Sequence, residues 1–285
     1  MSNEGKSHLE STVLNSRLFT FEVGENLDGK ATEIRVRQEA IAQLSRPLCL
    51  MMTGHHSESQ AGRTVWKDVS KETFEQFAQF AYTGDYFITA PVLREFDPEE
   101  WKEFDGSLDE SQEEKEYEEE GKGLPPGKKR KRSEKGATGK LITLSDLTFA
   151  RPERQRYWKV NRPATYYDSK YDYTQVLLCH ASLYILGDLW LVEPLKKLAL
   201  HKLQKTLNHF HIDKYKIRDV IHLLRVVYGE EGRTGPEGFE GGLAQLVCAY
   251  LAMHGEFLRD NENFIEFMGE GGQFVKDVWR LGIGK

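Results

Sequence analysis

One stretch of the chain, Val65–Tyr86, reads VWKDVSKETFEQFAQFAYTGDY and holds most of a short strand, expected over 64–69, and a helix, expected over 70–82. The apolar residues of this helix recur at intervals of three and four, at Phe74, Phe77, Ala78 and Ala81. This spacing places them on one helix face. Ser70 is suited to cap the first turn, and Gly84 stands where a helix commonly ends. We therefore expect this strand and helix to nucleate the core.

The composition is that of a folded protein with unevenly distributed charge. With 285 residues, 39% hydrophobic and 29% charged, the chain can form one large domain or two small ones. A net charge of −6 argues against nucleic acid as a general partner. Three cysteines lie far apart without a CxxC pair, which indicates a reducing, intracellular setting. No window approaches the ~18 apolar residues of a membrane span, so we expect a soluble protein without a membrane partner.

The pattern predicts an α+β fold in five consecutive regions. They are a disordered N-terminus (1–16), the first part of a domain (17–90), a largely disordered insertion (91–172), the second part of the domain (173–210) and a helical C-terminal region (211–285). Within the first part we expect strands over 17–23 and 32–36 that form a hairpin, a short helix over 47–53 and a polar loop over 55–63.

The insertion changes character along its length. Residues 94–122 contain 14 acidic residues against 4 basic ones, and LPPGKKRKRSEKGATGK follows, with Lys and Arg dominant. Such blocks cannot bury enough apolar surface to offset chain entropy, so 95–140 is expected to be disordered. Four tyrosines follow, at Tyr166, Tyr167, Tyr171 and Tyr173. They form either a binding edge or a packing contact of the returning chain, and we favour packing.

Regular structure is expected to return at Thr174, where TQVLLCHASLYILGDLW is apolar on more than one face and predicts a central helix. Further helices are expected from Pro194, over 217–228 and 243–254, and around 264–268 and 274–279. The C-terminal third is therefore expected to be all-helical.

The order of these elements resembles the BTB (POZ) domain. The matching blocks are FTFEVGENLDGKATEIRVRQEAIAQLSRPLCLMMTG, VWKDVSKETFEQFAQFAYTGDY and LLCHASLYILGDLWLVEPLKKLALHKL, about half of the chain. The chain is similar in particular to a large group of fungal BTB proteins whose C-terminal part is also helical. The resemblance implies a BTB-like helical cluster flanked by a short β-sheet, interrupted by the charged insertion and followed by the helical C-terminal region.

The resemblance also implies a function, that of a non-enzymatic protein–protein interaction module. Such a module works by self-association, as a homodimer, or as a substrate adaptor of a cullin-3 ubiquitin ligase. On this interpretation the helices beginning at Ser70 and Thr174 form the core. Partners then contact an exposed end formed by Tyr82, Asp85, Tyr86 and Phe87. Aromatic side chains beside an acidic residue can anchor a small interface.

Signals for catalysis are weak, and we predict no enzymatic activity, no cofactor and no metal. The GATGK run at 136–140 lacks the first Gly and the final Ser or Thr of a phosphate-binding loop. The six glycines of 229–242 follow a helix and precede no Lys, which favours a linker. The histidines at positions 180, 201, 209 and 211 lack the paired spacing of a zinc site and are expected on helix surfaces or at the edge of the core.

The strongest short signal outside the fold is KKRKR, formed by Lys128, Lys129, Arg130, Lys131 and Arg132. Five consecutive cations on a flexible arm suit the acidic groove of a nuclear import receptor. The alternatives are a solvated run that balances the neighbouring acidic block, and direct contact with nucleic acid. We therefore expect an intracellular protein that enters the nucleus, with a cytoplasmic location as the alternative. A second possible function is nuclear recruitment of transcription or chromatin factors through the charged insertion.

Overall fold

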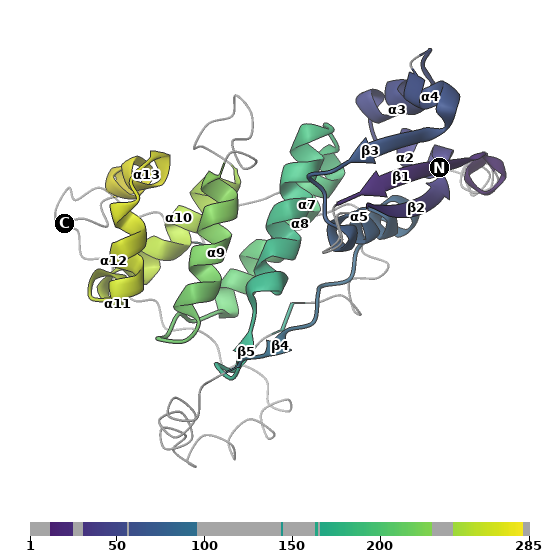
Figure 1. Cartoon of the computed structure of the whole chain (residues 1–285). Helices are drawn as coiled ribbons and strands as arrows, with labels where there is room; N and C mark the ends of the chain where they lie inside the picture. Colours follow the sequence, from purple (N-terminus) through teal and green to yellow (C-terminus); the bar gives the residue numbers. More distant parts are fainter. Residues whose placement is uncertain are drawn as a thin grey trace, which may run out of the picture. The chain divides into compact units, whose positions relative to one another are not determined.

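The protein has a mixed α+β fold (Figure 1). The computed structural model describes residues 12–24, 31–55, 57–95, 144, 163–164, 166–229 and 242–281. The chain divides into two units, one formed by 1–92 and 141–285 and the other by 93–140. Only residues 93–95 of the second unit are described. The predicted disorder of the N-terminus (1–16) is wrong for residues 12–15, which are helical. The rest of that N-terminus, most of the insertion, the GATGK run and most of the glycine-rich loop lie outside the described ranges.

The main sheet contains three strands in the order β2–β1–β3. β1 (Leu18–Val23) pairs antiparallel with β2 (Thr32–Arg37) and parallel with β3 (Arg63–Trp66). The hairpin prediction is therefore confirmed. Because side chains of a strand alternate between its faces, Phe19 and Phe21 of β1 point to the same side, and both are fully buried. This face of the sheet forms one wall of the core.

Parallel strands need a crossover connection. Three short helices supply it: α2 (Gln38–Ala42), α3 (Arg46–Thr53) and α4 (Ser57–Ala61). The predicted polar loop over 55–63 is wrong, because α4 and the start of β3 lie there. Ser59 is buried, and its Oγ donates a hydrogen bond to the carbonyl O of Met52 at 2.8 Å. The carbonyl O of Ser59 accepts from Nη2 of Arg17 at 2.7 Å. These contacts, one of them with Arg17, 42 positions away in the sequence, hold this polar helix in place.

The central helix α5 (Lys71–Thr83) confirms the helix predicted from the Phe spacing. The Oγ of Ser70 accepts a hydrogen bond from a backbone N–H of the first turn at 3.1 Å. Gly84, at φ 78°, ends the helix in the left-handed conformation. The buried ring of Phe74 lies 4.6 Å from that of Phe21 on β1, measured between centroids. The apolar face of α5 therefore packs on the sheet.

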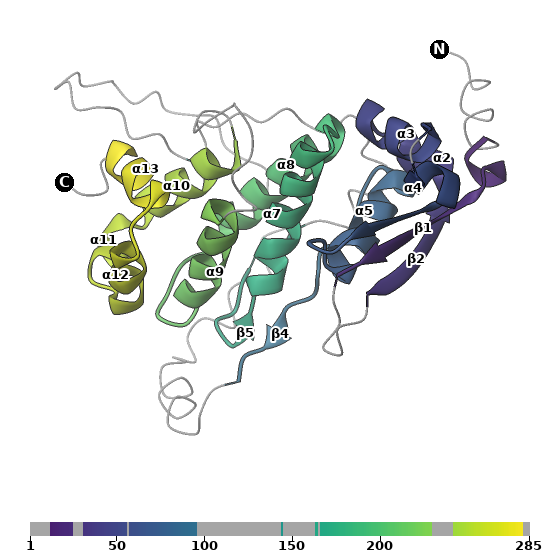
Figure 2. The ribbon, with the colours of Figure 1, turned by 45° about the horizontal axis from the view of Figure 1, so that its top comes forward.

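The remaining chain is mostly helical, as predicted for the C-terminal third. Two short strands, β4 (Val92–Leu93) and β5 (Tyr171–Asp172), precede the helices. The helices are α7 (Thr174–Leu189), α8 (Glu193–His209), α9 (Ile217–Tyr228), α10 (Leu243–Met253), α11 (Gly255–Arg259), α12 (Glu262–Gly269) and α13 (Gln273–Leu281). α7 packs against α5, α8 and α9, and Figure 2 shows α5 between the sheet and α7. In the described ranges, no helix has the length and apolar character needed to cross a membrane.

One hydrophobic core joins the parts of the chain on both sides of the insertion. Phe74 and Phe77 of α5 belong to the same buried cluster as Leu177 of α7, and Ile185 packs against this cluster. The prediction that two distant parts of the chain close into one interior is therefore confirmed. The same cluster continues through buried side chains of α9, α10, α12 and α13.

The tyrosines near the end of the insertion mostly pack inward. Tyr167 and Tyr173 are buried, and Tyr166 is exposed. The rings of Tyr167 and Tyr173 lie 5.4 and 5.6 Å from the ring of Phe210, both edge-to-face. Nζ of Lys216 donates a hydrogen bond to the carbonyl O of Tyr167 at 3.0 Å. Packing, rather than a binding edge, is therefore confirmed for the two buried tyrosines.

Candidate partner-binding site

The four residues predicted to contact partners lie at the end of α5 and just after it, but they do not share one surface. Tyr82 is 48% exposed and Phe87 is 57% exposed. Asp85 and Tyr86, between them, are buried. The expectation of a common exposed end is therefore wrong for Asp85 and Tyr86. The physical reason is a buried cation, Lys202 of α8, which draws both residues inward.

Lys202 has a completely buried side chain and makes three contacts with this segment. Its Nζ lies 2.6 Å from Oδ1 of Asp85 and donates a hydrogen bond to the carbonyl O of Tyr86 at 2.7 Å. The same Nζ lies 4.1 Å from the centre of the Tyr86 ring. Burial lowers the pKa of Lys202, while the Asp85 carboxylate opposes this shift. Since a buried charge is tolerated only when it is paired, these contacts fix the segment after α5 to α8.

Sequence reasoning missed Lys202, although a signal for its burial exists. Leu195 and Leu198 belong to the apolar stripe of α8, and position 202 is seven and four residues further on. That spacing places the Lys202 side chain on the buried face. Lysine is rarely fully buried unless it is paired, so its position in the stripe calls for an acidic partner. The identity of that partner depends on the tertiary fold.

Behind Tyr86 lies His180 of α7. The hydroxyl of Tyr86 and Nδ1 of His180 share a hydrogen bond at 2.8 Å, and Nε2 of His180 lies 3.4 Å from Oγ1 of Thr206. Burial, with a smaller contribution from the Lys202 charge, lowers the pKa of His180 to about 3. The imidazole is therefore neutral at physiological pH. The prediction of a surface or core-edge position is wrong for His180, because hydrogen bonds on both ring nitrogens make full burial tolerable.

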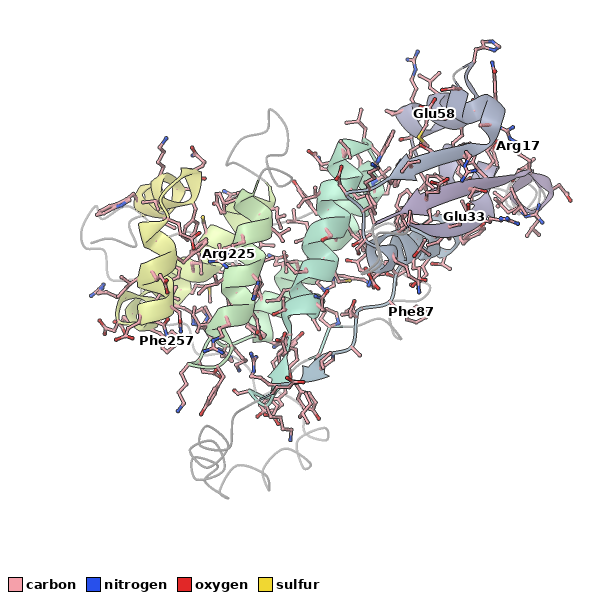
Figure 3. All side chains as sticks on the ribbon, in the orientation of Figure 1. Arg17, Glu33, Glu58, Phe87, Arg225 and Phe257 are labelled. Carbon is pink, nitrogen blue, oxygen red and sulfur yellow. The ribbon has the colours of Figure 1, made fainter. Side chains whose placement is uncertain are left out.

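Two glutamines of α5 hold the backbone of Phe87. Its N–H donates a hydrogen bond to Oε1 of Gln79 at 3.0 Å, and its carbonyl O accepts one from Nε2 of Gln76 at 3.5 Å. Nε2 of Gln76 also donates to Oγ1 of Thr89 at 2.9 Å. The backbone is thus fixed on both sides of the residue, while the Phe87 side chain points away from the fold (Figure 3). Phe87 is a preorganised apolar group on the surface.

Tyr82 is held in a different way. Its hydroxyl accepts a hydrogen bond at 2.7 Å from the backbone N–H of Arg37, at the end of β2. Part of its ring remains exposed. Tyr82 and Phe87 therefore present aromatic surface from braced positions, a property that lowers the entropy cost of binding. The buried residues between them, Asp85 and Tyr86, hold this segment against α8 through their contacts with Lys202.

The other predicted sites are placed as follows. His201 is half-buried, and His209 and His211 are exposed. Across the described ranges, no group of three or more His, Cys, Asp or Glu side chains could hold a metal ion. The predicted nuclear-localisation residues 128–132 lie outside the described residues.

No protein-family model, curated protein or solved structure matches this chain.

Proposed function

We propose that the chain is a non-enzymatic protein–protein interaction module of BTB type, which binds its partner through Phe87 and Tyr82. The observation that carries this proposal is the exposed Phe87 ring on a backbone fixed by Gln76 and Gln79. Aromatic residues held rigidly at a surface are typical anchors of protein interfaces. The residues first predicted to bind beside them, Asp85 and Tyr86, would act by holding this surface in place.

The assignment to the BTB type rests on the order of elements. A hairpin is followed by short crossover helices, a parallel strand, the Phe-rich helix α5 and the packed helix pair α7 and α8. This order supports the resemblance drawn from the three sequence blocks. The activities proposed with it are self-association as a homodimer and substrate recruitment for a cullin-3 ubiquitin ligase.

The test is affinity purification of the tagged full chain, with mass spectrometry of the proteins recovered. We expect cullin-3, further copies of the chain, or both, and we expect Phe87→Ala and Tyr82→Ala to reduce their recovery. Leu50→Ala is the matched control, because Leu50 is 52% exposed on α3, outside the proposed site. Normal recovery with Phe87→Ala would refute the site. Absence of both cullin-3 and self-association from wild-type samples would refute the proposed activities.

A second candidate function is nuclear recruitment through the charged insertion. The feature that favours it is the run of five cations at Lys128–Arg132, which lies in a segment whose charged composition predicts disorder. Deletion of 95–140 should therefore abolish nuclear localisation and leave the unfolding transition of the remaining chain intact. Loss of folding, or unchanged nuclear localisation, would contradict this function.

A further inference from the structure

Residues of α11, α12 and α13 line an apolar cavity of about 230 Å³ that is open to solvent on one side. Its floor is formed by buried side chains, among them Leu258, Phe264 and Val278. Two other lining residues are large and exposed, Ile265 at 53% and Trp279 at 61%. Exposed apolar side chains that adjoin a concave apolar surface are characteristic of binding sites. The cavity is built entirely from residues outside the proposed partner-binding site.

Arg259, the last residue of α11, adds a cation to this cavity. Among the described lining residues it is the one charged group, and it forms no ion pair with any described residue. Arg225, another exposed cation of the C-terminal helices, is by contrast paired with Glu270 at 2.7 Å. A guanidinium presents its N–H donors in a planar fork that matches the two oxygens of a carboxylate.

We propose that this cavity binds an apolar monocarboxylate, with the acyl chain among the apolar side chains and the carboxylate on Arg259. The cavity corresponds to about eight water volumes, which suits a medium-chain fatty acid of about eight carbons. Burial of the chain supplies the binding free energy, and the Arg259 contact supplies the selectivity for an acid over an alcohol. This site does not depend on the BTB-type function, and each can fail without the other.

The experiment is a calorimetric titration of the full chain with octanoate and, separately, with 1-octanol. We expect saturable octanoate binding in the ~0.1–1 mM range, as ligand efficiency allows for about ten heavy atoms. Arg259→Gln should weaken octanoate binding about tenfold and leave 1-octanol binding unchanged. Ile265→Glu should weaken octanoate binding as well, because the new carboxylate at the mouth of the cavity repels the carboxylate of octanoate. The matched control is Arg218→Gln, at an exposed arginine of α9 that does not line the cavity.

Tryptophan fluorescence provides a second readout that locates the ligand. Octanoate should shift the emission of the wild-type protein to the blue as Trp279 becomes covered. In Trp279→Phe this change should disappear while calorimetric binding remains. No saturable binding of octanoate up to about 5 mM would overturn the proposal. Equal octanoate affinity in wild type and Arg259→Gln would also overturn it. The proposal would fail as well if Ile265→Glu changed the oligomeric state but left octanoate binding unchanged, because the cavity would then be a protein interface.

Discussion

Nζ of Lys202 lies 2.6 Å from Oδ1 of Asp85, and this buried ion pair connects α8 to the segment that follows α5. The same Nζ binds the carbonyl O of Tyr86, a residue 116 positions away in the sequence. The pair therefore joins the two parts of the chain that the insertion separates. Removal of the carboxylate would leave a buried cation without a counter-charge, which is among the most destabilising changes a fold can undergo.

We predict that Asp85→Ala lowers the free energy of unfolding by about 3–5 kcal/mol. Urea denaturation followed by circular dichroism measures this change. The matched control is Glu270→Ala, which breaks an ion pair of nearly the same length, 2.7 Å, whose partners are both about half exposed. Solvent screens the control pair, so its loss should cost about 1 kcal/mol or less. A similar loss of unfolding free energy in both variants would show that the Asp85–Lys202 contact does not hold the segment after α5 to α8.

The second prediction concerns pH and His180. Burial lowers the pKa of His180 from 6.5 to about 3. Between these pH values the unfolded chain binds a proton that the folded chain does not, so stability rises with pH and falls as the pH falls. The contribution of this residue is about 1.4 kcal/mol per pH unit within the window. Urea denaturation at pH 5.5 and pH 4.5 should therefore show a smaller pH dependence in His180→Gln than in the wild type.

The control for this measurement is His209→Gln, because His209 is exposed at the end of α8. This variant should retain the full pH dependence of the wild type. If His180→Gln and the wild type lose the same free energy over this pH unit, His180 does not stay neutral in the fold, and the hydrogen-bonded arrangement with Tyr86 must be revised.

The fold could be predicted from the sequence wherever periodicity is strong. The Phe spacing of α5 and the apolar stripes of α9 and α10 each specify a helix and its buried face without reference to distant residues. α4 could not be found in this way. Its sequence, SESQA, has no apolar period, and its position depends on contacts of Ser59 with Met52 and Arg17.

The candidate site was predictable only in part, for a related reason. An aromatic residue next to an acidic one at the end of a helix predicts an exposed interface anchor. The exposure of the Phe87 side chain agrees with this prediction. Burial of Asp85 depends instead on Lys202, and no local pattern pairs positions so far apart. Only the apolar stripe of α8 indicates that Lys202 faces inward.

The third prediction compares two adjacent residues with opposite roles. Tyr86→Phe removes the hydroxyl that pairs with Nδ1 of His180 and should cost about 1–3 kcal/mol of stability, because a buried polar atom loses its partner. Phe87→Ala removes an exposed ring and should change stability by less than about 0.5 kcal/mol while it reduces partner recovery. Thermal denaturation and affinity purification of both variants measure the two effects. A large stability loss in Phe87→Ala would indicate that its ring packs on the fold and is not free to bind.

The last prediction concerns Trp66 of β3 and Trp190, which follows α7. Their rings are stacked with centroids 5.0 Å apart and planes 16° apart, so they join the sheet to the second part of the chain. Because Trp190 is half-buried, Trp190→Ala should cost about 2 kcal/mol, less than loss of a fully buried aromatic. The control Leu189→Ala removes an exposed neighbour and should cost about 0.5 kcal/mol or less. A double-mutant cycle with Trp66→Leu should give a coupling of about 0.5–1.5 kcal/mol. Additive effects would contradict a direct contact between the two rings. The closure of the fold across the insertion would then depend on its other contacts, among them the Lys202 ion pair, the Tyr86–His180 hydrogen bond and the α5–α7 packing.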